Sequence, residues 1–196
     1  VAECVSRIAD SISIPVTVKH RTGIDSIESY EFLHGFVKTV AQAGCKTFIV
    51  HARNAILKGL SPKENREIPP LKYQYVYRLK QDFPDLEIIL NGGITAIKSH
   101  PVDGIMIGRA AQNDPWVLHD VGKTRAQVAR KMVDYARKQE SLRHVTRHML
   151  GLYHGMPRAR RWRQMLSDSQ ALKRNDPELI LRALDEVESE ESRIGA

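Results

Sequence analysis

Four short apolar segments constrain the fold of this chain more than any other feature. Their sequences are VTVKHR (16–21), FIVHAR (48–53), IILNGG (88–93) and GIMIGR (104–109). Each is rich in β-branched residues and ends abruptly in polar residues or glycine, as does a strand that is buried on both faces and opens onto a site at its carboxyl end. Because helical stretches separate most of them, they predict parallel βα units, which in a barrel carry their functional groups at one rim.

The ends of these strands predict a binding site for an anion. They carry cations, a histidine, an asparagine and glycines, namely Lys19, Arg21, His51, Arg53, Asn91, Gly92, Gly93, Gly108 and Arg109. Glycines after neighbouring strands let backbone N–H groups approach an anion, and an arginine offers a fork of donors to phosphate oxygens. Since the last two strands of α/β barrels commonly form a phosphate site, we expect a phosphorylated ligand at this rim.

Three helices are predicted around the strands, spanning residues 1 to about 11, about 30–43 and about 73–82. The apolar positions of the second helix follow a period of 3.6 residues, Ser26 and Ser29 are its candidate caps, and Gly44 ends it. Residues 54–72 contain three prolines and a glycine, so we predict a long rim loop there, the kind of segment that often carries function. The segment between Gly93 and Asp103 is too short for a crossover helix, so either it is reduced to a turn or residues are missing from it.

Strand signals stop at Pro115, and we place a domain boundary there. Residues 1–115 form the predicted α/β domain and residues 116–196 a small all-α domain. Its predicted helices span 124–141, 143–154, 158–167 and 177–190. Trp162 could stack on a base, but burial in the helical core is favoured, and Met149, Leu150 and Leu152 are core candidates.

The positive charge of the chain is concentrated in the helical part. The net charge is +7, yet residues 123–164 alone hold 12 basic and 2 acidic side chains, whereas residues 178–191 hold six acids and one arginine. Such a basic block favours a polyanionic partner, RNA or DNA. A solvated helix face explains the same block equally well.

Several other classes of protein are disfavoured. No apolar run approaches the roughly 20 residues that cross a bilayer, and the first residues read as a helix and not as a signal peptide. Cys4 and Cys45 match no metal spacing, so we expect a reduced, cytoplasmic protein. His144 and His148 are four residues apart, as in helical zinc sites, but no glutamate follows the first histidine, and no metal site is predicted.

Longer segments around the strand ends carry a family resemblance. They are VTVKHRTGID, FIVHARNAILKGLSPKENREIPPL, ILNGGI, DGIMIGRAAQNDPW and HVTRHMLGLYHGMPRARRWR. Together they resemble the tRNA-dihydrouridine synthases, most closely the A-type bacterial subfamily, over nearly the whole chain. The resemblance implies the C-terminal half of a TIM (β/α)8 barrel, with its last four strands, followed by a small helical tRNA-binding domain. It also implies FMN-dependent reduction of uridine to 5,6-dihydrouridine in the D-loop of tRNA, with NADPH as the reductant.

The resemblance assigns roles to individual residues. FMN would be bound by Lys19, His51, Asn91, Gly92, Gly93, Gly108 and Arg109, with Lys19 at the flavin ring and the glycines, Asn91 and Arg109 around the ribityl phosphate. The tRNA would be bound by Lys63, Arg66, Arg160, Arg163 and Arg53. The family's proton donor is the cysteine of an Asn-x-Gly-Cys-Pro segment in the first half of the barrel. No segment here matches that half, and neither Cys4 nor Cys45 inherits the role, so no catalytic residue is predicted in this chain.

We therefore expect a fragment or incomplete product of such an enzyme, monomeric and without a membrane segment. A second hypothesis is a catalytically inactive half-barrel that acts as an RNA-binding module. A third is another flavin dehydrogenase that acts on a small metabolite. Bound flavin separates the first hypothesis from the second, and a steep salt dependence of tRNA binding separates the first from the third.

Overall fold

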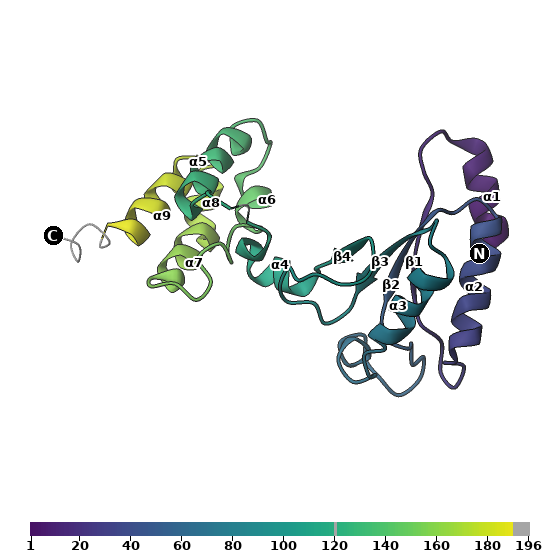
Figure 1. The fold of residues 1–196 in the computed structure, drawn as a ribbon. Helices are drawn as coiled ribbons and strands as arrows, with labels where there is room; N and C mark the ends of the chain where they lie inside the picture. The colour runs from purple at the N-terminus through teal and green to yellow at the C-terminus, as the bar shows by residue number, and fades with distance from the viewer. Residues whose placement is uncertain (120, 190–196) are drawn as a thin grey trace. The chain divides into compact units, whose positions relative to one another are not determined.

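The computed structural model of the chain describes residues 1–119 and 121–189. It divides into two compact units, residues 1–108 and the residues from Arg109 onward (Figure 1). From the sequence we placed the domain boundary near Pro115. The units are described separately below.

The first unit is an α/β structure built on a parallel sheet, as predicted. The four strands are β1 (Thr17–Arg21), β2 (Thr47–His51), β3 (Glu87–Asn91) and β4 (Gly104–Met106). They lie in the order β1-β2-β3-β4, and each pair is parallel. All four therefore present their carboxyl ends at the same edge of the sheet.

Helices α1 (Ala2–Ser11), α2 (Tyr30–Gln42) and α3 (Tyr73–Asp82) complete this unit. The side chain of Ser29 caps α2 by accepting a hydrogen bond from the Phe32 N–H at 3.2 Å, which decides between the two candidate caps. One core joins the helices to the sheet, and its fully buried members include Leu33, Val37, Phe48, Val50, Val76, Leu79, Ile88 and Leu90. Because side chains alternate along a strand, the residues between these core positions face the opposite side of the sheet.

Two irregular connections match their predictions. Residues 54–72 form a long loop that contains only the short 3-10 helix η1 (Glu64–Arg66). The connection from β3 to β4 contains no helix among its described residues, yet the two strands still pair in parallel. Ile94 and Val102 from this connection pack against the core of the unit. Those apolar contacts replace the ones that a crossover helix usually makes.

The second unit has no strand among its described residues. It contains α4 (Arg109–Asn113), the 3-10 helix η2 (Pro115–Leu118), α5 (Arg125–Ala136), α6 (Leu142–Thr146), α7 (Ala159–Ser167), α8 (Ser169–Lys173) and α9 (Leu179–Glu188). Trp162 is completely buried and donates from Nε1 to the carbonyl oxygen of Met149 at 2.8 Å. The predicted burial of Trp162, Met149 and Leu152 is confirmed, whereas Leu150 is only partly buried.

The predicted helix over 143–154 is confirmed only over 143–146. Helix α6 ends at Thr146, and the following residues form turns. Gly151 explains part of this difference, because a Cβ there would lie 2.0 Å from the carbonyl oxygen of Asn113. The chain turns so that this backbone approaches a segment far away in the sequence. Helix α8 was not predicted, and the last residue of the predicted helix 177–190 lies outside the described residues.

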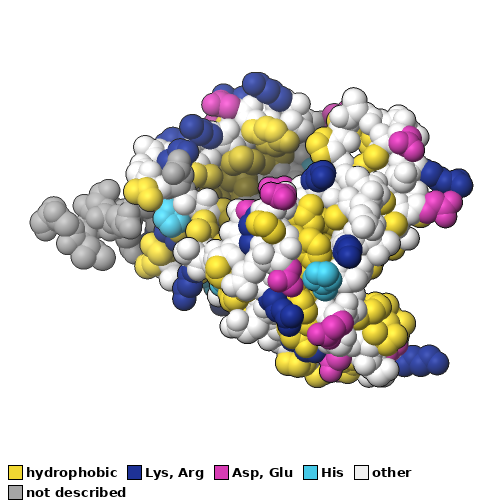
Figure 2. Space-filling view, turned by 45° about the vertical axis from the view of Figure 1, so that its right-hand side comes forward, with side chains coloured by type: hydrophobic (Ala, Val, Ile, Leu, Met, Phe, Trp, Pro, Cys, Tyr) yellow, Lys and Arg dark blue, Asp and Glu magenta, His cyan; other side chains and the backbone are white. Residues whose placement is uncertain are grey.

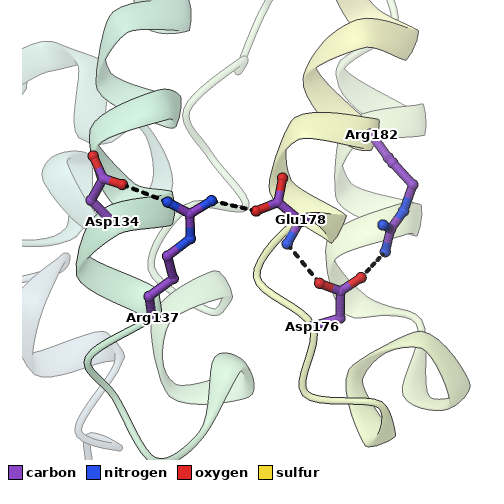
Figure 3. A network of polar contacts seen from close by, with 5 residues as sticks. All are labelled: Asp134, Arg137, Asp176, Glu178 and Arg182. Carbon is purple, nitrogen blue, oxygen red and sulfur yellow. Dashed lines mark hydrogen bonds and ion pairs between the residues drawn. The ribbon is translucent and has the colours of Figure 1, made fainter.

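A polar network holds the carboxyl end of α5 to the start of α9 (Figure 3). Arg137 binds Asp134 at 3.0 Å and Glu178 at 2.6 Å. Asp176 accepts hydrogen bonds from the Glu178 N–H at 3.0 Å and from Arg182 at 2.8 Å. Acidic side chains of the C-terminal segment are thereby used to pair arginines within the unit.

Candidate functional site

The face of the sheet opposite the core carries the predicted ligand-binding side chains. Strand register places Arg21 beside His51, and His51 beside Asn91, at the carboxyl ends of β1, β2 and β3. Lys19 lies two residues before Arg21 on the same face of β1 and is exposed. The structure thus brings Lys19, His51 and Asn91 together on one side of one sheet edge.

Arg21 connects the end of β1 to the long loop. Its Nη1 donates to the carbonyl oxygens of Asn54 at 2.8 Å and Asn65 at 2.7 Å. The side chain of Asn65 in turn exchanges two hydrogen bonds with the backbone of Ile56, at 2.8 and 2.6 Å. These contacts hold η1 beside the strand ends. The sequence placed Arg21 at the rim but assigned it no role, since nothing local indicates which carbonyl groups it meets.

The two loop cations of the predicted RNA site lie on this anchored segment. Lys63 directly precedes η1, Arg66 ends it, and both are exposed. Arg53 is placed differently, because it is half-buried and donates from Nη1 to the carbonyl oxygen of Pro69. Its Nε is buried and has no hydrogen-bond partner among the described residues. Arg53 therefore holds the far end of the loop to β2.

The Asn91-Gly92-Gly93 turn requires its glycines. Gly92 has φ +109° and Gly93 has φ +66°, in the left-handed region that side chains disfavour. A Cβ on Gly92 would lie 2.8 Å from Cδ2 of His51. Tyr73 donates its hydroxyl to the carbonyl oxygen of Gly92 at 2.6 Å, and Asn91 donates from Nδ2 to Met106 at 2.7 Å. The turn is therefore fixed directly against His51.

The strand ends form an electropositive cluster. Partial burial, and secondly the charge of Arg21, lower the pKa of Lys19. Burial, and then the charges of Arg53 and Arg66, lower the pKa of Arg21. Arg21 thus disfavours the charge of Lys19, and Arg53 and Arg66 disfavour the charge of Arg21. An anion bound among them would relieve this repulsion.

The remaining predicted residues lie at or beyond the end of the first unit. Gly108 is the last residue of that unit, and Arg109 is the first residue of α4 in the second. Arg160 and Arg163 are both exposed on α7, three residues apart on one side of the helix. On the face drawn in Figure 2, Lys and Arg side chains are exposed on both halves of the molecule.

Two kinds of feature are absent from the part of the chain that the structure describes. Within it, no helix has the length and apolar character that crossing a bilayer requires. In the same residues, no three His, Cys, Asp or Glu side chains gather in a way that could hold a metal ion.

The parallel sheet, with cations, an amide and glycines at its strand ends, defines an α/β protein. The sequence matches the dihydrouridine synthase (Dus) family over residues 1–188, and the chain belongs to this family. It is 49% identical to the tRNA-dihydrouridine(20/20a) synthase of Synechocystis sp., over 94% of this chain and 61% of that protein. It is 44% identical to the synthase of the same name from Vibrio cholerae, over 97% of this chain and 64% of the relative.

A third relative, from Escherichia coli strain K12, bears the same name. It is 49% identical over 86% of this chain and 55% of its own length. The chain thus spans between about half and two thirds of the length of the curated relatives that it matches.

Proposed function

We propose that this chain is the part of a tRNA-dihydrouridine synthase that contains the last four strands of its barrel and the helical RNA-binding domain. The complete enzyme reduces uridine to 5,6-dihydrouridine in the D-loop of tRNA, with FMN as cofactor and NADPH as reductant. The names of the relatives favour positions 20 and 20a as targets. In this proposal, residues 1–115 belong to the barrel and residues 116–196 bind tRNA. The protein acts as a monomer in the cytoplasm.

The cluster of Lys19, His51 and Asn91 on one sheet face carries this proposal. FMN is a planar ring system with a terminal phosphate, and the cationic strand ends fit such an anion. His51, packed on Gly92, and the turn at Gly93 form one wall of the proposed site. The family resemblance assigns Gly108 and Arg109 to the phosphate of FMN.

When bound, FMN supplies the hydride that adds to C6 of the uracil ring. Lys19 stabilises negative charge at the flavin ring, and its exposure on the uncovered sheet face leaves the ammonium group accessible. A proton must also reach C5. Cys45 does not deliver it, because its thiol is completely buried in the core, donates to the Thr47 carbonyl oxygen at 3.3 Å and has a pKa raised by burial. Cys4 lies on α1 and not at the strand ends that form the proposed site. We therefore place the proton donor outside this chain.

Cations from both units orient the tRNA in this proposal. Lys63 and Arg66 act from the long loop, and Arg160 and Arg163 act from α7. Arg53, which follows β2, holds the far end of the loop in place. Contacts of this kind with phosphates set the register of a nucleic acid without reading its bases. They also offset the energy needed to unstack the target uridine.

Two titrations of the purified 196-residue chain test this proposal. Oxidised FMN is added while its fluorescence is followed, and labelled tRNA is added at 50 and 200 mM salt. We expect flavin binding together with tRNA binding that weakens steeply with salt. Binding of tRNA without flavin favours the catalytically inactive RNA-binding module, and flavin binding without tRNA binding favours a dehydrogenase of small metabolites.

A further inference from the structure

A cavity of about 570 Å³ lies within the helical unit, apart from the residues assigned above. Its walls come from α6, the turns that follow it, α7 and α8. The polar side chains that line it are Arg143, His144, Thr146, Arg147 and Ser167, and three leucines supply its apolar surface. The cavity therefore combines a cationic rim with hydroxyl groups and an apolar wall.

Thr146 is the least expected member of this lining. Its side chain is 1% exposed, and its hydroxyl has no hydrogen-bond partner among the described residues. Buried hydroxyl groups are nearly always paired, because an unpaired one loses its bonds to water without replacement. If the side chain turned toward the cavity, its hydroxyl would meet an acceptor supplied by a ligand there.

The two arginines at the rim of the cavity, Arg143 and Arg147, are available to a ligand. Arg143 and Arg147 are four residues apart, so they lie on the same side of the chain as it leaves α6, and both are exposed. Neither forms an ion pair with any residue that the structure describes. Elsewhere in the same unit, Arg137, Arg161 and Arg182 are paired with Glu178, Glu186 and Asp176. The local acids thus neutralise other arginines and leave this pair to an external anion.

The cavity also continues the proposed RNA-binding side of α7. Ser167 lies four residues after Arg163 and seven after Arg160, so all three share one side of the helix. Its hydroxyl donates to the carbonyl oxygen of Arg163 at 2.7 Å, which holds the Ser167 side chain against the helix. An RNA strand bound along Arg160 and Arg163 would reach the cavity at Ser167.

We propose that this cavity binds a phosphate group of the RNA backbone, in addition to the phosphates met by Arg160 and Arg163. Arg143 and Arg147 donate to its oxygens, and the Thr146 side chain turns toward the cavity so that its hydroxyl donates to one of them. The leucines contact the adjoining ribose. This site rests on the proposed binding of tRNA by the helical unit.

The double variant Arg143→Ala/Arg147→Ala tests the site, with Arg130→Ala/Lys131→Ala as a control that removes the same charge from exposed positions of α5. We expect the first variant to bind tRNA about 10- to 100-fold more weakly than the parent chain. Its plot of log K against log salt should flatten by about one, the value for one lost phosphate. The control should change both quantities much less, and circular dichroism should report the same fold for all three proteins.

Thr146→Val separates ligand binding from a structural role. We expect an equal or higher Tm, because an unpaired buried hydroxyl is removed, together with tRNA binding that is weaker by a few fold. Unchanged tRNA affinity in the arginine variant would refute the site and leave the proposed function standing. Absence of tRNA binding by the parent chain would instead contradict the proposed function and this site with it.

Inorganic phosphate distinguishes the source of the anion. We expect phosphate at matched ionic strength to compete only weakly with tRNA. If phosphate raises the Tm of the parent but not of the arginine variant, and the variant binds tRNA normally, the occupant is a free anion and the RNA assignment is wrong.

Discussion

Nη1 of Arg21 lies 2.7 Å from the carbonyl oxygen of Asn65, 44 residues further along the chain. The same atom binds the carbonyl oxygen of Asn54. This pair of bonds attaches the loop that carries Lys63 and Arg66 to the end of β1. The position of the two loop cations therefore depends on a side chain of the sheet.

Replacement of Arg21 by lysine tests this connection. Arg21→Lys keeps the charge but loses the planar fork, so the loop should detach at a cost of about 2 kcal/mol in the free energy of unfolding. Limited proteolysis should cut within residues 54–66 faster than in the parent chain, and urea unfolding gives the stability. Lys98→Ala, at an exposed position, serves as the control. An unchanged cleavage rate would mean that other contacts hold the loop.

Gly92 and Gly59 form a matched pair of glycines with positive φ. A Cβ on Gly92 meets His51, whereas a Cβ on Gly59 meets nothing within 4 Å. Both alanine variants should lose about 1 kcal/mol from backbone strain, and Gly92→Ala should lose about 1–3 kcal/mol more from the clash. We expect only Gly92→Ala to weaken FMN binding, which fluorescence titration measures. Equal effects of both variants would exclude a role for packing against His51.

Lys19→Ala tests the proposed charge stabilisation at the flavin ring. The substitution should slow flavin reduction and uridine reduction in the complete enzyme by about 100-fold, because a cation that faces developing charge is lost. The affinity for tRNA should stay near that of the parent, since Lys19 lies on the sheet face and not on the loop. Stopped-flow absorbance and filter binding measure the two quantities. Unchanged turnover would reject the role.

Arg160→Ala/Arg163→Ala tests the α7 contacts with tRNA. We expect tRNA binding to weaken by about 10-fold or more and the salt slope to fall, while FMN stays bound. Because both side chains are exposed, the fold should be unaffected. Loss of flavin in proportion to loss of tRNA binding would count against the assignment.

Asp176 gives the second unit a defined pH dependence. Its hydrogen bond from Arg182, and then that from the Glu178 N–H, lower the pKa of its carboxyl group in the folded state. The ionised group therefore stabilises the fold above the ordinary pKa of 3.8, and this contribution is lost as the pH falls below that value through the lowered pKa. Because the pair is well exposed, Asp176→Asn should lower Tm by only about 2–5 °C at pH 7. The difference from the parent should shrink below pH 4, and a constant difference down to pH 2 would contradict this account.

Much of the architecture was predictable because buried positions recur with a regular period along the sequence as apolar residues. The apolar runs at 48–50 and 88–90 indicated strands buried in a parallel sheet, and both lie there. The places of Lys19, His51 and Asn91 on the sheet were predictable for the same reason, since polar residues after such a run lie toward the strand end. The helix expected over 143–154 ends early, at Thr146, and its local pattern contains no sign of Asn113, which the backbone at Gly151 approaches.

The amino-acid pattern alone thus specified where strands run and which residues end them. The hydrogen bonds of Arg21 to the long loop, the packing of His51 on Gly92 and the unpaired hydroxyl of Thr146 emerged only in three dimensions. The physical reason is that each depends on which groups, remote along the chain, meet or fail to meet after folding. A local pattern records how deeply a residue is buried, but it carries no record of the partner.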